Sequence, residues 1–173
     1  LVRRLVGLGE RVVRHREPDE ANPIGRLIRS LLAEGEFPKA HMPLFLADRL
    51  AQPPRVQEFL ASGGWVVQSR CWLSTLVYQA DLWPDDLLWA LHDECDLMTG
   101  RIFLLDVPVD VALARMGDRK RECFETGGHL QNCRYRYLAR VGWPGLDITK
   151  IDGTLPPDEV EAAIWAEIQK GAP

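Results

Sequence analysis

Short apolar runs that alternate with amphipathic stretches constrain the fold of this chain more than any other feature. WVVQS (residues 65–69) and RIFLLDVP (101–108) are largely apolar, which is typical of parallel strands buried on both faces. RVVRH (11–15) and DITKIDG (147–153) have the composition of two more short strands. Helical spacing fills the intervals, so the sequence predicts an α/β fold in which helices flank both faces of a parallel β-sheet.

Proline and glycine residues predict where the helices begin and end. Pro23 and Gly35 should bound one helix, because proline suits a first turn and glycine suits the position just past the last turn. Residues 40–64 form a long stretch with helical character that Pro53-Pro54 should bend or break. The interval 73–95 predicts a helix in two pieces before the third strand.

Composition narrows the classes of function. The 173 residues suit one domain over residues 1–173 with a single core. A net charge of -4 argues against broad nucleic-acid binding, and no apolar run reaches the roughly 18 residues of a membrane span. Four cysteines without a CxxC pair argue against a zinc site and predict reduced thiols in the cytoplasm. The histidines, which have no partner spacing and are expected to be structural, are His15, His41, His92 and His129.

Polar residues stand where each expected strand ends, and ligands of parallel α/β sheets bind beyond that edge. In chain order these residues are Arg16, Ser69-Arg70, Asp106 and Asp152-Gly153. Arg16 and Arg70 at one edge of the sheet would make a fork-shaped site for a phosphate. The alternative for Arg16 is a local ion pair with Glu20.

Phe45 and Arg49 are four residues apart, so they would share one face of a helix. An aromatic ring beside a guanidinium can stack on a nucleotide base while the guanidinium donates to a carbonyl on the base edge. The plainer alternative makes Phe45 a core residue and Arg49 a surface residue paired with Asp48. Spacing alone leaves both alternatives open.

Five motifs carry a resemblance to a known family. They are REP (16–18) followed by PIGRLIRSLL, LFLADRLAQ (44–52), VVQSRCWLSTLVYQA (66–80), FLLDVPVDVALARMGDRKRECFE (103–125) and IDG (151–153). In this order, and over nearly the whole chain, they resemble the thymidylate kinases, members of the P-loop nucleoside monophosphate kinases. The resemblance implies transfer of the γ-phosphate of ATP to dTMP or another deoxynucleoside monophosphate, with Mg²⁺. It also implies pairing into a homodimer.

The resemblance further implies roles for individual residues. Arg16 would lie beside the acceptor phosphate and Arg70 would hold it, while Phe45 stacks on the thymine ring. Arg49 would donate to the base edge, and Tyr78 would pack below the deoxyribose. The full set implied for the acceptor nucleotide is Arg16, Glu17, Pro18, Phe45, Arg49, Arg70, Ser74, Thr75, Tyr78 and Gln79.

On the donor side, the resemblance implies a lid over residues 117–128 that closes on the ATP phosphates. Arg115, Arg119 and Arg121 would belong to this lid, and the loop after Asp152 would lie by the adenine. The residues implied to bind ATP are Arg115, Arg119, Asp152 and Gly153. Those implied to act in catalysis are Arg70, Arg119 and Arg121, and the metal ligands stay unknown.

Two departures from the family pattern leave alternatives open. The sequence has no G-x-x-x-x-G-K-[ST] loop, so an N-terminal strand and P-loop are expected to precede the helix that opens this chain. Ser69 stands where the family has an acid, and Cys71 stands where it has an aromatic residue. The alternatives are a catalytically inactive nucleotide-binding homologue and a deoxynucleoside kinase of the same fold.

Overall fold

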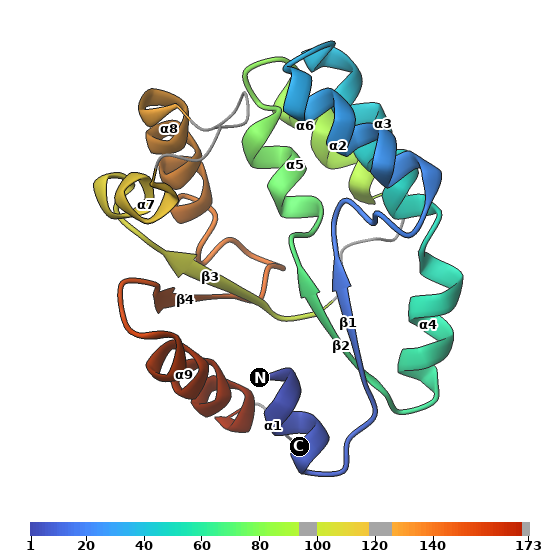
Figure 1. Cartoon of the computed structure of the whole chain (residues 1–173), viewed down its shortest axis with the longest axis vertical. Coiled ribbons are helices and arrows are strands. Elements are labelled where there is room, and N and C mark those ends of the chain that lie inside the picture. Colours follow the sequence, from blue (N-terminus) through green and yellow to red (C-terminus); the bar gives the residue numbers. More distant parts are fainter. Residues whose placement is uncertain (94–99, 118–125, 171–173) are drawn as a thin grey trace. The chain divides into compact units, whose positions relative to one another are not determined.

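The computed structural model describes residues 1–93, 100–117 and 126–170 (Figure 1). The chain divides into two compact units, Val2–Thr99 and Gly100–Pro173 together with Leu1. One domain over residues 1–173 therefore stays a prediction. Across the described part of the chain, no helix combines the length and the apolar character that crossing a bilayer requires.

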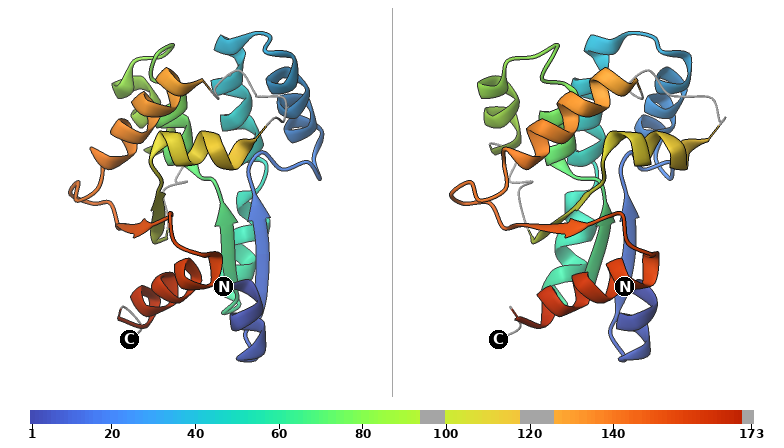
Figure 2. Two further views of the ribbon diagram at one scale, coloured as in Figure 1. Left: turned by 60° about the vertical axis from the view of Figure 1, so that its left-hand side comes forward. Right: turned by 90° about the vertical axis from the view of Figure 1, so that its left-hand side faces the viewer.

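The first unit contains a pair of parallel strands among six helices. Its elements are α1 (Val2–Gly7), β1 (Val12–Arg16), α2 (Pro23–Glu34), α3 (Pro38–Leu50), α4 (Pro53–Ala61), β2 (Trp65–Ser69), α5 (Trp72–Tyr78) and α6 (Asp85–Asp93). The register runs from Val12 opposite Trp65 to Arg16 opposite Ser69. The two strands lie side by side along their length in Figure 1 and again in Figure 2.

The second unit repeats this arrangement with a shorter set of elements. They are β3 (Ile102–Asp106), α7 (Val109–Met116), α8 (Gly127–Leu138), β4 (Ile148–Asp152) and α9 (Pro157–Lys170). β3 and β4 are parallel, with Asp106 opposite Asp152 at their carboxyl ends. All four predicted strands are present and both pairs are parallel, which confirms the α/β class. The described residues form two two-stranded sheets where the sequence predicts one.

Local signals account for the helix boundaries. Asn22 caps α2, because its side-chain oxygen accepts the backbone N–H of Gly25 at 2.9 Å, and Pro23 occupies the first turn. Gly35 ends the same helix with φ 72°, a left-handed conformation that costs glycine little. The predicted break before Pro53 is confirmed, since α3 and α4 are separate helices.

Helix α5 carries much of the buried core of the first unit. It has 7 residues and would be unstable alone, so packing must hold it in place. Its side chains that are no more than 1% exposed are Leu73, Leu76 and Val77. Trp72 meets Trp89 of α6 edge to face, with ring centroids 5.7 Å apart. Burying this helix also takes the polar side chains of Thr75 and Gln79 inside.

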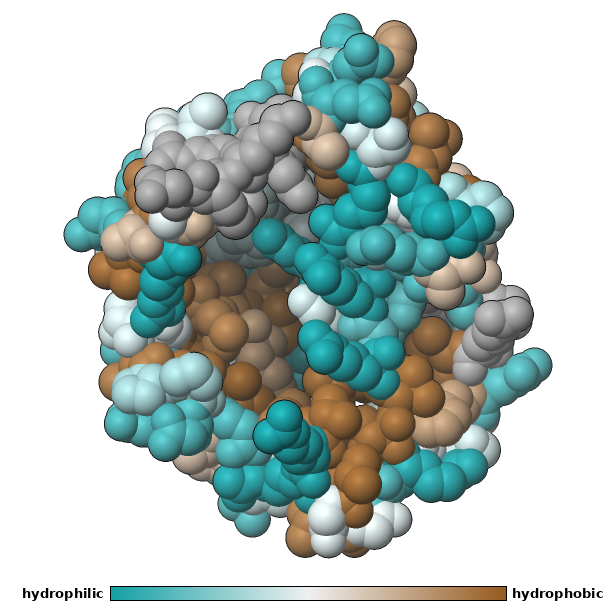
Figure 3. All heavy atoms as spheres, in the orientation of Figure 1, coloured by the Kyte–Doolittle hydropathy of each residue, from teal (hydrophilic) through white to brown (hydrophobic). Residues whose placement is uncertain are grey.

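The surface of the first unit contains both hydrophilic and apolar side chains. Hydrophilic side chains cover much of the face over α2 and α3 in Figure 3. Val13 on β1 and Trp65 on β2 remain 40% and 38% exposed. A two-stranded sheet has little stability by itself, so the helical core must supply most of the stability of this unit.

Gly25 lies where the loop after β1 packs closely against the first turn of α2. A Cβ at this position would lie 2.1 Å from the backbone oxygen of Asp19, which cannot swing away as a side chain could. We expect Gly25→Ala to lower the free energy of unfolding by about 1–3 kcal/mol, measured by urea denaturation. Gly7→Ala is the control, because its Cβ would meet nothing within 4 Å. Equal unfolding free energies for both variants would contradict this close approach.

Candidate active site

The two arginines predicted at strand ends lie at one edge of the first unit's sheet. Arg16 ends β1 opposite Ser69, the last residue of β2, and Arg70 follows directly. The backbone N–H of Glu17 extends the pairing by donating to the carbonyl of Ser69 at 3.0 Å. The shared edge predicted from the sequence is therefore present.

The side chain of Arg16 is exposed, and it makes no hydrogen bond or ion pair with any residue in the described part of the chain. Its alternative partner, Glu20, pairs instead with Nε of Arg29 at 3.2 Å. Because an arginine cannot lose its charge, this guanidinium presents a full positive charge to solvent at the strand end.

Arg70 has a backbone conformation that is unusual for a residue with a side chain. Its φ is 72°, in the left-handed region that costs an L-residue about 1–2 kcal/mol. Its Nη1 donates to the hydroxyl of Tyr78 at 3.1 Å, and the guanidinium lies 5.0 Å from the centroid of that ring. Strain of this kind tends to gather at binding sites, where it aims a side chain.

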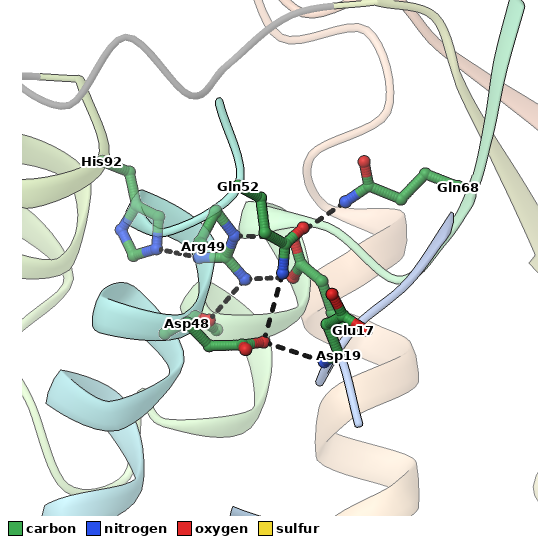
Figure 4. Close-up of polar contacts among 8 residues, drawn as sticks. Glu17, Asp19, Asp48, Arg49, Gln52, Gln68 and His92 are labelled. Atoms are coloured by element: carbon green, nitrogen blue, oxygen red, sulfur yellow. Dashed lines mark hydrogen bonds and ion pairs between the residues drawn. The ribbon is translucent and has the colours of Figure 1, made fainter. Parts of the chain in front are cut away.

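A buried ion pair joins the loop after β1 to helix α3 (Figure 4). Nε of Arg49 donates to Oε1 of Glu17 at 2.9 Å, and Nη2 donates to Oε2, so the contact is bidentate. The two side chains are only 6% and 3% exposed. Nε2 of Gln68 on β2 also donates to Oε1 of Glu17, at 2.8 Å. The alternative that Arg49 is a surface residue paired with Asp48 is therefore wrong.

Asp48 fastens the loop after β1 to helix α3. Its carboxylate accepts the backbone N–H of Asp19 at 3.0 Å, the side chain of Asn22 at 2.7 Å and the side chain of Gln52 at 3.4 Å. Pro18, which is buried and preceded by a cis peptide bond, lies in the same loop. A carboxylate that is 1% exposed is tolerated there because N–H donors replace its lost water.

His92 on α6 contacts the opposite side of the Arg49 guanidinium. Its Nε2 lies 2.8 Å from Nη1 of Arg49, and its Nδ1 lies 2.6 Å from the carbonyl oxygen of Leu88. Arginine can only donate, so Nε2 must accept and the ring proton must sit on Nδ1, which donates to Leu88. Burial, assisted by the charge of Arg49, lowers the pKa of His92 to about 4, so the ring is neutral at physiological pH.

Helix α5 adds a hydroxyl and an amide to this cluster. Oγ1 of Thr75 accepts a long hydrogen bond from Nη2 of Arg49 at 3.4 Å. Gln79 is 1% exposed, and neither of its amide atoms has a hydrogen-bond partner among the described residues. A buried amide without partners costs about 1–3 kcal/mol, so a ligand or water that paired with it would be stabilised.

The remaining residues predicted for the acceptor side are half-buried. Phe45 lies on α3 one turn before Arg49, as their spacing requires, and Ser74 and Tyr78 lie on α5. The first unit thus brings Glu17 and Thr75 into direct contact with Arg49. His92 also belongs to this cluster through its hydrogen bond with Arg49, although the sequence did not predict it as part of any site.

In the second unit, hydrogen bonds join the end of α7 to the loop after β4. Arg115 donates from Nη1 to the carbonyl oxygen of Gly153 at 2.6 Å and from Nη2 to that of Thr154 at 2.9 Å. Hydrogen bonds from the hydroxyl and backbone N–H of Thr154 hold the pKa of Asp152 below its ordinary value. Three residues predicted for the ATP side (Arg115, Asp152 and Gly153) thus belong to one small cluster.

An ion pair that the sequence did not indicate lies at the carboxyl end of β3, beside that of β4. Nε and Nη2 of Arg134 on α8 donate to the two carboxylate oxygens of Asp106, at 2.7 and 3.1 Å. Arg119 and Arg121 lie outside the described residues, as does most of the predicted lid (117–128). No group of three or more His, Cys, Asp or Glu side chains able to hold a metal ion occurs within the described ranges.

Comparison of the sequence with known proteins identifies the family of the chain. The family model for thymidylate kinase matches residues 1–164. The chain belongs to the thymidylate kinase family. A probable thymidylate kinase of Methanoculleus marisnigri is 33% identical over 165 residues, which is 91% of this chain and 80% of that protein. A thymidylate kinase of Bordetella petrii is 33% identical over 174 residues, covering 94% and 82%.

A thymidylate kinase of Akkermansia muciniphila is also 33% identical, over 144 residues that cover 81% of this chain and 68% of that protein. These findings confirm the predicted family and, with it, the P-loop NTPase fold. As a member of the thymidylate kinase family, the chain is a nucleoside monophosphate kinase, a transferase.

Ser69 is a departure from the family pattern that the neighbouring Glu17 cannot compensate. Ser69 lies at the exposed end of β2 and carries no charge. Glu17 follows the paired strand, but both of its oxygens are occupied, Oε1 by Arg49 and Gln68 and Oε2 by Arg49. Its carboxylate is therefore committed within the protein and is not available as a substitute acid.

The strain at Arg70 can be measured by comparing two variants that both lack the guanidinium. Glycine adopts φ 72° without a Cβ clash, whereas alanine does not. We expect Arg70→Gly to unfold in urea with a free energy about 1 kcal/mol higher than that of Arg70→Ala. Because both variants lose the contacts with Tyr78 equally, identical stabilities would show that the backbone at this residue is relaxed.

The lowered pKa of His92 predicts that acid destabilises this kinase. Between the ordinary histidine pKa of 6.5 and the native value of about 4, the unfolded chain binds a proton that the native chain does not. Stability therefore falls as the pH drops through this window, by about 2 kcal/mol near pH 4.5. The neighbouring charge is Arg49 on α3, and the ring's other polar contact is the carbonyl of Leu88 on its own helix.

His92→Gln isolates that contribution, because glutamine can accept from Arg49 but does not titrate. Urea unfolding of both proteins at pH 7 and pH 4.5 should show a smaller acid loss for the variant, by about 2 kcal/mol. Carboxylates elsewhere titrate equally in the two proteins and cancel in the difference. The same acid loss in both would mean that His92 does not titrate abnormally.

Proposed function

We propose that this protein transfers the γ-phosphate of ATP to dTMP, giving dTDP and ADP. Membership in the thymidylate kinase family supports the reaction. The observation that carries the acceptor site is the register of β1 and β2, which places Arg16 and Ser69-Arg70 at adjacent strand ends. This arrangement supplies two permanent positive charges at the edge where ligands of α/β sheets bind.

Arg16 and Arg70 would hold the phosphate of dTMP. The guanidinium of Arg16 has no partner among the described residues, and Arg70 lies over the ring of Tyr78 in a backbone conformation that aims it away from an ordinary strand path. Guanidinium groups suit phosphate because their forked donors match its oxygens. In phosphoryl transfer the protein contributes chiefly by positioning and charge stabilisation, so a firmly held acceptor phosphate is the main requirement.

Arg49 and Gln79 would meet the thymine ring. An arginine has five N–H donors, and the contacts with Glu17, Thr75 and His92 use four of them. Within the described part of the chain one Nη1–H is left, which suits a carbonyl oxygen on the base edge. Gln79 adds a buried amide that has no partner among the described residues, and Phe45 lies one turn before Arg49 for stacking.

The donor side of the proposal rests on the second unit. Arg115, Asp152 and Gly153 would lie by the adenine and phosphates of ATP, and Arg119 and Arg121 would act from the lid. The described residues make no carboxylate cluster for Mg²⁺, and Ser69 offers no charge, so they do not form a metal site by themselves. Mg²⁺ commonly binds through substrate phosphates with few protein ligands, and here it would arrive with ATP.

Steady-state kinetics of the purified full-length protein test the reaction. With ATP and Mg²⁺, ADP release should show the highest kcat/KM for dTMP among dTMP, dUMP, dGMP and dCMP. Binding of nucleotide without turnover would favour the inactive homologue, and turnover of thymidine would favour the nucleoside kinase. A homodimer and a cytoplasmic location stay predictions.

Arg70→Ala tests the proposed phosphate contact. It should weaken dTMP binding at least about tenfold in calorimetry, because a charge-assisted contact is lost, while thymidine binding changes little. Arg16→Ala should act in the same direction, and Arg14→Ala is its control, an exposed arginine on the same strand but two residues before its end. Equal losses for dTMP and thymidine would count against a phosphate at this edge.

A further inference from the structure

A continuous chain of hydrogen bonds crosses the first unit behind the proposed base site. It runs from Gln68 on β2 to Glu17, from Glu17 to Arg49 on α3, and from Arg49 to His92 on α6. It ends where Nδ1 of His92 donates to the carbonyl of Leu88. Figure 4 shows the contacts that join Gln68, Glu17, Arg49 and His92. His92 lies 43 residues from Arg49 in the sequence, and Gln68 lies 51 residues from Glu17.

We propose that His92 and Gln68 are positioning residues for recognition of the acceptor base, and that they act by fixing the guanidinium of Arg49 from opposite sides. The inference rests on the proposed function, in which Arg49 donates to that base. Neither residue is assigned a contact with the nucleotide. Their effect would reach it only through the orientation of Arg49.

The donor count shows why His92 matters. The guanidinium is planar and rigid, so its orientation is set by which of its edges are held. Glu17 and Thr75 take the donors on Nε and Nη2, while His92 takes one of the two donors on Nη1. Without that acceptor, both Nη1 donors would lack partners among the described residues. The guanidinium would then be held only through Nε and Nη2, and Nη1, which is proposed to donate to the base, would not be held.

The tautomer of His92 determines that its ring accepts a hydrogen bond from Arg49. Nε2 can accept from Arg49 only while the proton stays on Nδ1, and the carbonyl of Leu88 holds it there. The ring is 0% exposed, so no water can replace either contact without rearrangement. The low pKa of His92 agrees with a ring that remains a neutral acceptor under physiological conditions.

Gln68 supports the same guanidinium from the far side of Glu17. Its amide donates to Oε1, the oxygen that also accepts Nε of Arg49. A carboxylate held by a third donor cannot rotate freely, so the bidentate contact keeps one plane. Gln68 immediately precedes Ser69, which links the base side of the site to the strand end that carries Arg70.

The test compares two substitutions of His92 in the full-length protein. His92→Leu removes the acceptor, and we expect it to raise the KM for dTMP about tenfold while kcat and the KM for ATP stay within about twofold. His92→Gln places an acceptor oxygen near the position of Nε2 and should keep the KM for dTMP within about threefold of wild type. Gln68→Met, which keeps the length and removes the donor, should raise the same KM more mildly.

A core variant on the same helix separates positioning from simple destabilisation. Leu88→Ala removes a side chain that is 0% exposed but leaves the backbone carbonyl of that residue in place. It should lower the unfolding free energy and leave the KM for dTMP near wild type. The inference is overturned if His92→Leu leaves this KM unchanged, if His92→Gln fails to restore it, or if Leu88→Ala raises it equally.

The wild-type protein distinguishes failure of this inference from failure of the proposed function. No turnover of dTMP by wild type would reject the function. Normal turnover with no difference between His92→Leu and wild type would reject only the positioning role. A ¹⁵N spectrum of the histidine rings gives a readout that needs no nucleotide, since the inference requires His92 to carry its proton on Nδ1, and a proton on Nε2 would overturn it.

Discussion

The buried ion pair between Glu17 and Arg49 is the interaction on which the rest of the proposed acceptor site depends. Removing charged groups from water costs several kcal/mol for each ion, so the pair persists only because most of its polar atoms have hydrogen-bond partners. Gln68, Thr75 and His92 supply those further contacts. Such a pair adds little net stability, but losing one partner costs about 3–5 kcal/mol, so it holds five segments of the chain in one arrangement.

The ion pair also divides the arginines of this unit into two kinds. Glu17 neutralises Arg49, which leaves it a source of oriented N–H donors and suits it to an uncharged base. Arg16 is exposed and has no acidic partner in the described ranges, so it keeps its full charge for an anion. Arg70 lies at the same strand end in a left-handed conformation. The loop after β1 thus lies between an exposed charged arginine, Arg16, and a buried arginine whose charge is neutralised, Arg49, which are the two kinds of group that the proposed phosphate and base contacts need.

The predictions made from the sequence succeed where the controlling interaction is local. Apolar runs marked β2 and β3, local composition marked β1 and β4, and proline and glycine marked the ends of α2 and the break before Pro53. The shared edge of Arg16 and Arg70 followed from parallel pairing alone. Spacing could not decide whether Arg49 lay on the surface, because its burial depends on Glu17, a residue 32 positions away. The alternative that paired Arg49 with Asp48 fails for the same reason, because the partners of Asp48 include Asp19 and Asn22, which lie 29 and 26 positions away.

What the sequence determined by itself is the order of strands and helices, the residues at the strand ends and the family, because each depends on neighbours along the chain or on motifs in order. Only the tertiary structure decided which acid each arginine meets. It also gave His92 a role that no local pattern marked, since its contact with Arg49 forms only when α3 and α6 pack together. A side chain's chemistry follows from its residue type, but its partner follows from packing across tens of residues.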